Sequence, residues 1–193
     1  MSGGPDSMAI LDFLRRGKKN LTVLHYNHGT LFAKEAERIV SDYCFKHNID
    51  LIIDRLIEEP PPGESLENFW RKFRYNFFEK STFLPIITCH HLDDAVENWL
   101  FTSLHGNPMM IPLARDQFIR PFLATSKDVL VDWCDRKDVP YILDPSNNDV
   151  SFMRNYIRHQ LMPQVLHVNP GLKKVIKKKI CRLQKLLPVV VYN

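Results

Sequence analysis

Short β-rich runs alternate along this chain with longer stretches of helical spacing, and this alternation constrains the fold more than any other feature. β-rich runs lie at residues 21–26, 49–53 and 83–88, with helical stretches between them at residues 33–47 and 65–80. Strands separated by helices favour a parallel sheet that is covered on both faces. We therefore expect an α/β fold with a doubly wound, mostly parallel sheet.

The rest of the chain is predicted to be largely helical. One further short strand is expected at Tyr141–Leu143. Helices are expected at residues 7–16, 93–104, 127–137, 152–161 and 171–187. In doubly wound sheets, ligands bind at the carboxyl ends of the strands. The segments that follow a strand or precede a helix are therefore the candidate sites.

Charge is distributed unevenly along the chain. Residues 1–149 carry 17 basic and 22 acidic side chains, whereas the last 44 residues carry nine basic side chains and no acidic ones. This split predicts a domain at residues 1–149 and a basic helical segment at residues 150–193 that binds a polyanion. A solvated basic helix without a ligand is the alternative.

Cysteine spacing and hydropathy exclude several classes of protein. The four cysteines form no CxxC pair, which argues against a disulfide framework, a zinc ribbon or a redox dithiol and favours a reducing cytoplasm. No run approaches the ~18–20 apolar residues of a membrane-spanning helix. The N-terminus also lacks the basic and apolar regions of a secretory signal.

The sharpest motif is a loop of six residues before the first expected helix: Ser2, Gly3, Gly4, Pro5, Asp6 and Ser7. Two glycines let the backbone approach an anion, and the N–H groups of a helix N-terminus carry a partial positive charge. Asp6 would repel a phosphate group unless it binds a metal ion, so the loop predicts a phosphate site with Mg²⁺. A glycine turn that only caps a helix is the alternative.

A second motif follows the third expected strand, where two histidines precede several acids in residues 90–97. On a helix, Asp93 and Glu97 share one face and Asp94 lies on the adjacent one. Such carboxylates can hold Mg²⁺, bind an amine as a cation or accept its proton. Aspartates in a first turn can equally stabilise the helix dipole, and the residues alone leave both interpretations open.

A third motif lies near the start of the basic segment. It combines Asp144–Asp149 with two arginines four residues apart, Arg154 and Arg158. The arginines could bind an anionic substrate. They could also be solvated cations, or form surface ion pairs with Asp144 and Asp149 that contribute little to stability.

Together these motifs resemble those of a known family. The loop is similar to the PP-loop of the ATP pyrophosphatases, which split ATP between its α and β phosphates. Within that superfamily the chain resembles the tRNA(Ile)-lysidine synthetases, whose catalytic domain has SGGxDS, a HxxHG-like turn, ExxxRxxRY, HHxDDxxE and DPSN…RNxIRH. The matching segments here are residues 2–7, 25–29, 67–75, 90–97 and 144–159.

The resemblance implies an adenine nucleotide α-hydrolase-like fold and a ligase reaction in two steps. ATP would adenylate the C2 oxygen of the wobble cytidine in an isoleucine tRNA anticodon, releasing pyrophosphate. The ε-amine of free lysine would then attack C2 and expel AMP, which yields lysidine. ATP and Mg²⁺ are the implied cofactors, and isoleucine tRNA and free L-lysine are the implied partners.

The resemblance also implies a role for individual residues. The nucleotide would be bound by the loop Ser2–Ser7 and by His28, with Asp6 as the metal ligand. The implied catalytic residues are Asp6, Asp93, Asp94, Glu97 and Arg158. The implied tRNA-binding residues are Arg71, Arg74, Asn147, Arg154, Asn155, Lys173, Lys174, Lys177 and Lys178.

The chain departs from the family pattern at its start, because a hydrophobic strand precedes the loop in the family and the loop begins here at residue 2. Either that strand is lacking or the C-terminal Val189–Tyr192 fills its place, as in a circular permutation, unless it is a frayed tail. We expect a minimal form that contains the catalytic domain only. Two other functions stay open: a thiolase-like PP-loop tRNA-modifying enzyme and a non-catalytic tRNA-binding module.

Overall fold

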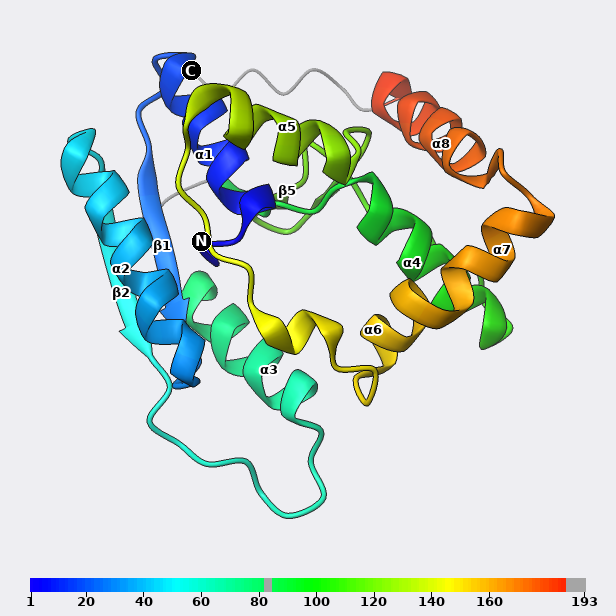
Figure 1. Ribbon diagram of the computed structural model, residues 1–193, viewed down its shortest axis with the longest axis horizontal. Helices are drawn as coiled ribbons and strands as arrows, with labels where there is room; N and C mark the ends of the chain where they lie inside the picture. The colour runs from blue at the N-terminus through cyan, green and yellow to red at the C-terminus, as the bar shows by residue number, and fades with distance from the viewer. Residues whose placement is uncertain (82–84, 187–193) are drawn as a thin grey trace. The chain divides into compact units, whose positions relative to one another are not determined.

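A computed structural model of the protein describes residues 1–81 and 85–186, which fall into two compact units (Figure 1). Unit 1 is drawn from Met1–Ile86 and Leu130–Pro145, and unit 2 from Ile87–Val129 and Ser146–Asn193. These units follow contacts between residues. The division expected at residue 150 follows charge and possible function, and it stays a prediction.

The sheet of unit 1 is parallel. Strand β1 (Thr22–Asn27) pairs in parallel with β2 (Asp50–Arg55), and helix α2 (Leu31–Lys46) connects them. Figure 1 shows α2 running along both strands, which it contacts, and α3 (Leu66–Glu79) also packs against β1. This strand–helix–strand unit confirms the expected α/β fold and its parallel pairing.

Helices α1 (Pro5–Arg16) and α5 (Lys127–Lys137) form where the sequence predicts them. Proline at the first position of α1 suits a helix start, because its missing N–H would have no partner there. Phe13 of α1 packs edge-on against Trp133 of α5, with 5.4 Å between the ring centroids.

A buried carboxylate ties these elements of unit 1 together. Asp12 is 1% exposed and accepts hydrogen bonds from the Tyr43 hydroxyl at 2.5 Å, Arg15 at 2.7 Å, Arg16 at 2.6 Å and the Trp133 indole at 2.9 Å. Burial alone would raise the pKa of Asp12. The four donors outweigh burial and hold this pKa well below its usual value.

Helix packing dominates unit 2. Helices α4 (Leu92–Leu104) and α8 (Leu172–Leu186) pack against each other around a buried apolar cluster. Helix α8 contributes Leu172, Ile176 and Ile180, which repeat every four residues and leave its lysines on the other faces.

Three short strands accompany these helices in the order β3-β5-β4. Strand β3 (Ile86–Ile87) lies within the strand expected at residues 83–88 and is shorter than it, because Pro85 and Thr88 are not part of the strand. Strands β4 (Ala114–Arg115) and β5 (Phe118–Ile119) form an antiparallel hairpin that the sequence analysis did not predict.

The helix expected at residues 152–161 continues further than predicted. It begins as α6 (Met153–Tyr156), widens into one π-helical stretch at Ile157–Leu161 and ends as α7 (Met162–Val168). A short 3₁₀ helix at Pro145–Asn148 precedes it.

The prediction of a strand at Tyr141–Leu143 is wrong. These residues belong to no strand in the described part of the chain. The Ile142 N–H donates a hydrogen bond to the Gly3 carbonyl at 3.0 Å, and this contact alone does not form a strand pairing. The strand suggested at Val189–Tyr192 lies outside the described residues. No helix in residues 1–81 or 85–186 is long and apolar enough to cross a bilayer.

The buried carboxylate generates a stability prediction. Asp12→Asn should lower the free energy of unfolding by about 3 kcal/mol, because it removes one partner of a buried ion-pair network. In the wild type, the same stabilisation should be lost as pH falls below the ordinary carboxyl pKa of 3.8, since the folded-state pKa is lower. Urea unfolding followed by circular dichroism at several pH values measures both effects.

The matched control is Asp132→Asn. Asp132 accepts a hydrogen bond from Arg136 at 2.8 Å, but both side chains are more than half exposed. This substitution should change the free energy of unfolding by less than about 0.5 kcal/mol. Equal losses for the two variants would contradict the role assigned to Asp12.

Candidate functional site

The glycine loop of unit 1 is held in a conformation that only glycine tolerates well. Gly3 has φ +77°, and a Cβ atom there would lie 3.0 Å from the Cβ of Ala36 on α2. Gly4 then precedes Pro5, the first residue of α1. The backbone therefore turns tightly against α2 and presents the N-terminus of a twelve-residue helix.

Hydroxyl groups and backbone contacts fix this loop. The Ser2 and Ser7 hydroxyls lie 3.0 Å apart, and the Ser7 hydroxyl also donates to the Gly4 carbonyl at 3.0 Å. The Cys134 thiol of α5 donates to the Pro5 carbonyl at 3.4 Å. The amides of the first turn of a helix have no acceptor within the helix, so they are available to an anion.

Asp6 lies half-buried in the first turn of α1. Mg²⁺ in nucleotide sites is commonly held by one or two carboxylates together with substrate phosphates and water. A single carboxylate beside an anion-binding helix start fits that donor set. No cluster of three metal-ligating side chains occurs among the described residues, so the loop itself offers no complete protein cage for a metal.

His28 follows β1 and lies among aromatic rings. Its ring centroid is 5.1 Å from that of Tyr26 and 5.5 Å from that of Trp70 on α3, and its buried Nδ1 has no hydrogen-bond partner in the described chain. Burial, with a smaller effect of the Arg74 charge, lowers the pKa of His28 to about 4. The imidazole is therefore neutral near pH 7.

Two of the three arginines expected to contact tRNA lie on α3, one turn apart. Arg71 is exposed, and its guanidinium carbon lies 4.6 Å from the Tyr75 ring centroid. Arg74 is half-buried, and its charge acts on His28. The positive charge of Arg74 thus contributes to the lowered pKa of His28, whereas the Arg71 guanidinium stacks on the Tyr75 ring of the same helix.

In unit 2, the acids at the start of α4 have structural partners. Asp94 forms a capping box with His91: its carboxylate accepts from the His91 amide at 2.9 Å, and its own amide donates to the His91 ring at 3.4 Å. Asp93 accepts from the Lys127 amide at 2.8 Å and forms an ion pair with Lys173. Burial alone would raise the pKa of Asp93, but these donors lower it.

Glu97 is buried and forms a bidentate ion pair with Arg158. The two hydrogen bonds measure 2.7 and 2.9 Å, and Glu97 is 5% exposed. Arg158 lies in the π-helical stretch, a feature that often occurs at functional sites. The structure therefore brings these two predicted residues together within unit 2.

The segment before α6 is held by its own side chains. The Asn155 amide is buried and donates to the carbonyls of Ser146 and Asp149 at 2.8 and 2.9 Å. The His159 ring lies 2.8 Å from the Asn147 carbonyl. Asn155 therefore stabilises this turn, whereas Asn147 and Arg154 have exposed side chains.

Two basic residues of α8 face the rest of unit 2: Lys173 points to Asp93, and the Lys179 ammonium lies 5.9 Å from the Trp99 ring centroid. The other five are exposed, and together with the half-buried Cys181 they line an open hollow along one face of the helix: Lys174, Lys177, Lys178, Arg182 and Lys185. This face is a strongly cationic strip.

Asn27 lies beside His28 within the predicted motif at residues 25–29, where the sequence pattern assigns it no role of its own. Asn27, 5% exposed, binds the Gly29 amide at 2.8 Å and Glu37 of α2 at 2.8 Å, and Glu37 in turn binds Arg55. An Asn directly before His-Gly is a turn signal that could have pointed to Asn27. No sequence spacing predicts its pairing with Glu37.

A parallel strand pair with a glycine loop at a helix N-terminus is typical of α/β proteins that bind phosphate groups. Comparison with known families agrees: the profile described as a PP-loop domain matches residues 1–165. The chain belongs to this PP-loop domain family, as the sequence motifs predicted.

Several similar proteins are named tRNA(Ile)-lysidine synthase. A tRNA(Ile)-lysidine synthase from Lactiplantibacillus plantarum is 32% identical over 90% of this chain and 43% of its own length. One from Staphylococcus aureus is 33% identical over 86% of this chain and 43% of its own length. One from a Thermotoga species is 28% identical over 93% and 47%. The chain thus spans less than half the length of these relatives.

A solved structure supports the fold. The U34-tRNA thiolase NcsA from Methanococcus maripaludis matches 97% of this chain and 71% of its own, with a TM-score of 0.68 and 18% sequence identity. At this identity the match establishes a shared fold.

Proposed function

We propose that this chain contains the catalytic domain of a tRNA(Ile)-lysidine synthase, a ligase that forms a carbon–nitrogen bond. The observation that carries the proposal is the Ser2–Ser7 loop at the start of α1. In this loop, a Cβ atom at Gly3 would lie 3.0 Å from the Cβ of Ala36 on α2. Relatives of that name, about 30% identical over most of the chain, support the assignment of this loop to ATP.

The first step of the proposed reaction belongs to unit 1. The cytidine O2 forms a bond to the α phosphorus of ATP, and the bond from that phosphorus to the bridging oxygen breaks, so pyrophosphate leaves. The loop amides and the hydroxyls of Ser2 and Ser7 would stabilise the charge on the leaving group. Mg²⁺ held by Asp6 would supply further positive charge there.

His28 is assigned to the nucleoside part of ATP. A neutral imidazole flanked by Tyr26 and Trp70 offers apolar surface, which suits a base or ribose better than a phosphate. Arg71 and Arg74, on the nearby helix α3, are assigned to the tRNA backbone.

The second step is assigned to the acids of α4. The lysine ε-ammonium must lose a proton before its nitrogen attacks C2, whereupon the C2–O bond breaks and AMP leaves. Asp94 or Glu97 would accept this proton, and Asp93 would contribute negative charge. An ionised carboxylate has about four acceptor positions, so their present hydrogen bonds leave room for an amine. Arg158 holds Glu97 through their ion pair, and its positive charge would help to stabilise the phosphate leaving group.

We assign further tRNA contacts to exposed residues of unit 2. The cationic strip of α8 would contact phosphates, and Asn147 and Arg154 would add contacts from the segment before and within α6. Asn155 would act by holding that segment. A single-stranded anticodon base can be unstacked into a pocket, which this reaction needs. The proposed location is the cytoplasm.

The reaction itself provides the most direct test. With labelled ATP, lysine and isoleucine tRNA, the protein should release AMP only when lysine is present and should incorporate lysine into tRNA. Asp6→Asn should lower this rate by about 100-fold, the loss typical of removing one group that stabilises developing charge. Thin-layer chromatography of AMP and scintillation counting of tRNA measure the two products.

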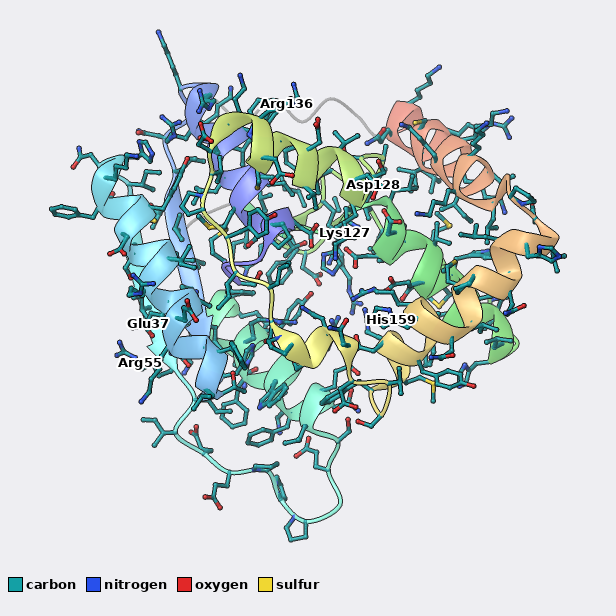
Figure 2. All side chains as sticks on the ribbon, in the orientation of Figure 1. Glu37, Arg55, Lys127, Asp128, Arg136 and His159 are labelled. Carbon is teal, nitrogen blue, oxygen red and sulfur yellow. The ribbon has the colours of Figure 1, made fainter. Side chains whose placement is uncertain are left out.

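The matched control is Asp128→Asn, because Asp128 lies in the first turn of α5 as Asp6 does in α1 and is exposed (Figure 2). It should leave the rate unchanged. AMP release without lysine incorporation would favour a thiolase-like enzyme with another acceptor. No AMP release at all would favour the non-catalytic tRNA-binding module.

Salt dependence tests the role of α8. Each phosphate contact adds roughly 0.7–0.9 to the slope of log affinity against log salt. Changing Lys174, Lys177 and Lys178 together to Gln should therefore reduce that slope by about 2–3. Fluorescence anisotropy with labelled tRNA at several salt concentrations measures the slope.

Two controls accompany this variant. Changing Lys18, Lys19 and Lys46 of unit 1 to Gln removes the same charge from exposed positions and should leave the slope unchanged. Lys173→Gln should have a small effect, because its ammonium is paired with Asp93. An affinity that does not vary with salt would refute the role of the strip.

A further inference from the structure

We infer that Glu37 of α2 is a positioning residue for the nucleotide site: it holds Asn27 and, through Asn27, the turn that carries His28. The inference rests on the proposed role of His28 in binding ATP. Asn27 lies at an unspecified position of the HxxHG-like segment at residues 25–29, and the family motifs assign no role to Glu37, Asn27 or Arg55.

Asn27 is the central member of this group. It is the last residue of β1 and is 5% exposed. Its side-chain oxygen accepts from the Gly29 amide at 2.8 Å, while its side-chain nitrogen donates to Glu37 at 2.8 Å. Its backbone carbonyl accepts from the Leu56 amide at 2.8 Å. Both ends of the amide are used, so its orientation is fixed.

Gly29 shows why this fixation matters. It has φ +79°, so the chain reverses sharply directly after His28. The Asn27 contact to the Gly29 amide spans His28 and closes this turn. The direction of the imidazole therefore depends on the orientation of the Asn27 side chain.

Arg55 holds Glu37 in place from the end of β2. Its guanidinium donates to both oxygens of Glu37, at 2.5 and 3.2 Å, and Figure 2 shows the two labelled side chains side by side. This bidentate pairing lowers the pKa of Glu37. Glu37 is then ionised near neutral pH and cannot donate a proton, so the Asn27 nitrogen must face it.

Helix α2 links this group to the glycine loop. Ala36, the residue before Glu37, is the one that would touch a Cβ at Gly3. One turn of α2 therefore contacts both predicted parts of the nucleotide site, the loop for the phosphates and the turn for the nucleoside. Removing the Glu37 carboxylate should loosen the turn and leave the loop intact.

A comparison of two ligands tests this inference. In calorimetric titrations, Glu37→Ala should bind an ATP analogue with a methylene bridge between the α and β phosphates about 10-fold more weakly. It should bind inorganic pyrophosphate within twofold of the wild type. A general structural defect in unit 1 would weaken the binding of both ligands. The ratio of the two affinities therefore separates such a defect from a specific loss of nucleoside binding.

Three variants serve as controls. Glu35→Ala removes an exposed carboxylate from the same helix and should change neither affinity. Glu37→Gln keeps an acceptor for Asn27 and should recover most of the ATP affinity. The double variant with Asn27→Ala and Glu37→Ala should bind the ATP analogue as tightly as Asn27→Ala alone, because Glu37 acts through Asn27.

The outcomes are distinct. If the wild type binds neither ligand, the proposed nucleotide site is wrong. If the wild type binds both, the inference is overturned in two cases: Glu37→Ala binds the analogue as tightly as the wild type, or it loses both ligands equally.

Discussion

The close approach of Gly3 to Ala36 is the contact on which the rest of the account depends. A side chain at residue 3 would meet α2 at 3.0 Å, so the loop can turn into α1 there only as glycine. This contact holds residue 3, two residues before the start of α1, against α2. The following residue of α2, Glu37, fixes Asn27 at the end of β1. A single helix thus organises both the phosphate loop and the turn at His28.

Much of the fold could be predicted from the sequence because its elements have strong local signals. Amphipathic spacing gave α1, α2, α3 and α5 within two residues, and the strands separated by α2 pair in parallel as expected. The residues of the loop also lie together, because they are consecutive. Local chemistry decides such features, and tertiary contacts change them little.

Features that depend on distant partners could not be predicted. Tyr141–Leu143 has strand-like residues, but one backbone bond to Gly3 does not make a ladder. The α4 acids gave an ambiguous pattern, and the structure shows that Asp94 caps the helix while Asp93 and Glu97 take partners 80 and 61 residues away. Lys173 was grouped with its neighbours by charge, although its ammonium faces Asp93. Such pairings come from packing within unit 2, which sequence spacing does not encode.

The central claim is that the backbone amides of the loop and of the first turn of α1 bind the phosphates that leave as pyrophosphate. Titration of ¹⁵N-labelled protein with pyrophosphate, followed by amide NMR, tests it directly. The account predicts saturable shifts at Gly3, Gly4, Asp6 and Ser7, with the amides of α8 less affected. Shifts confined to the lysine-rich face of α8, or none at the loop, would contradict it.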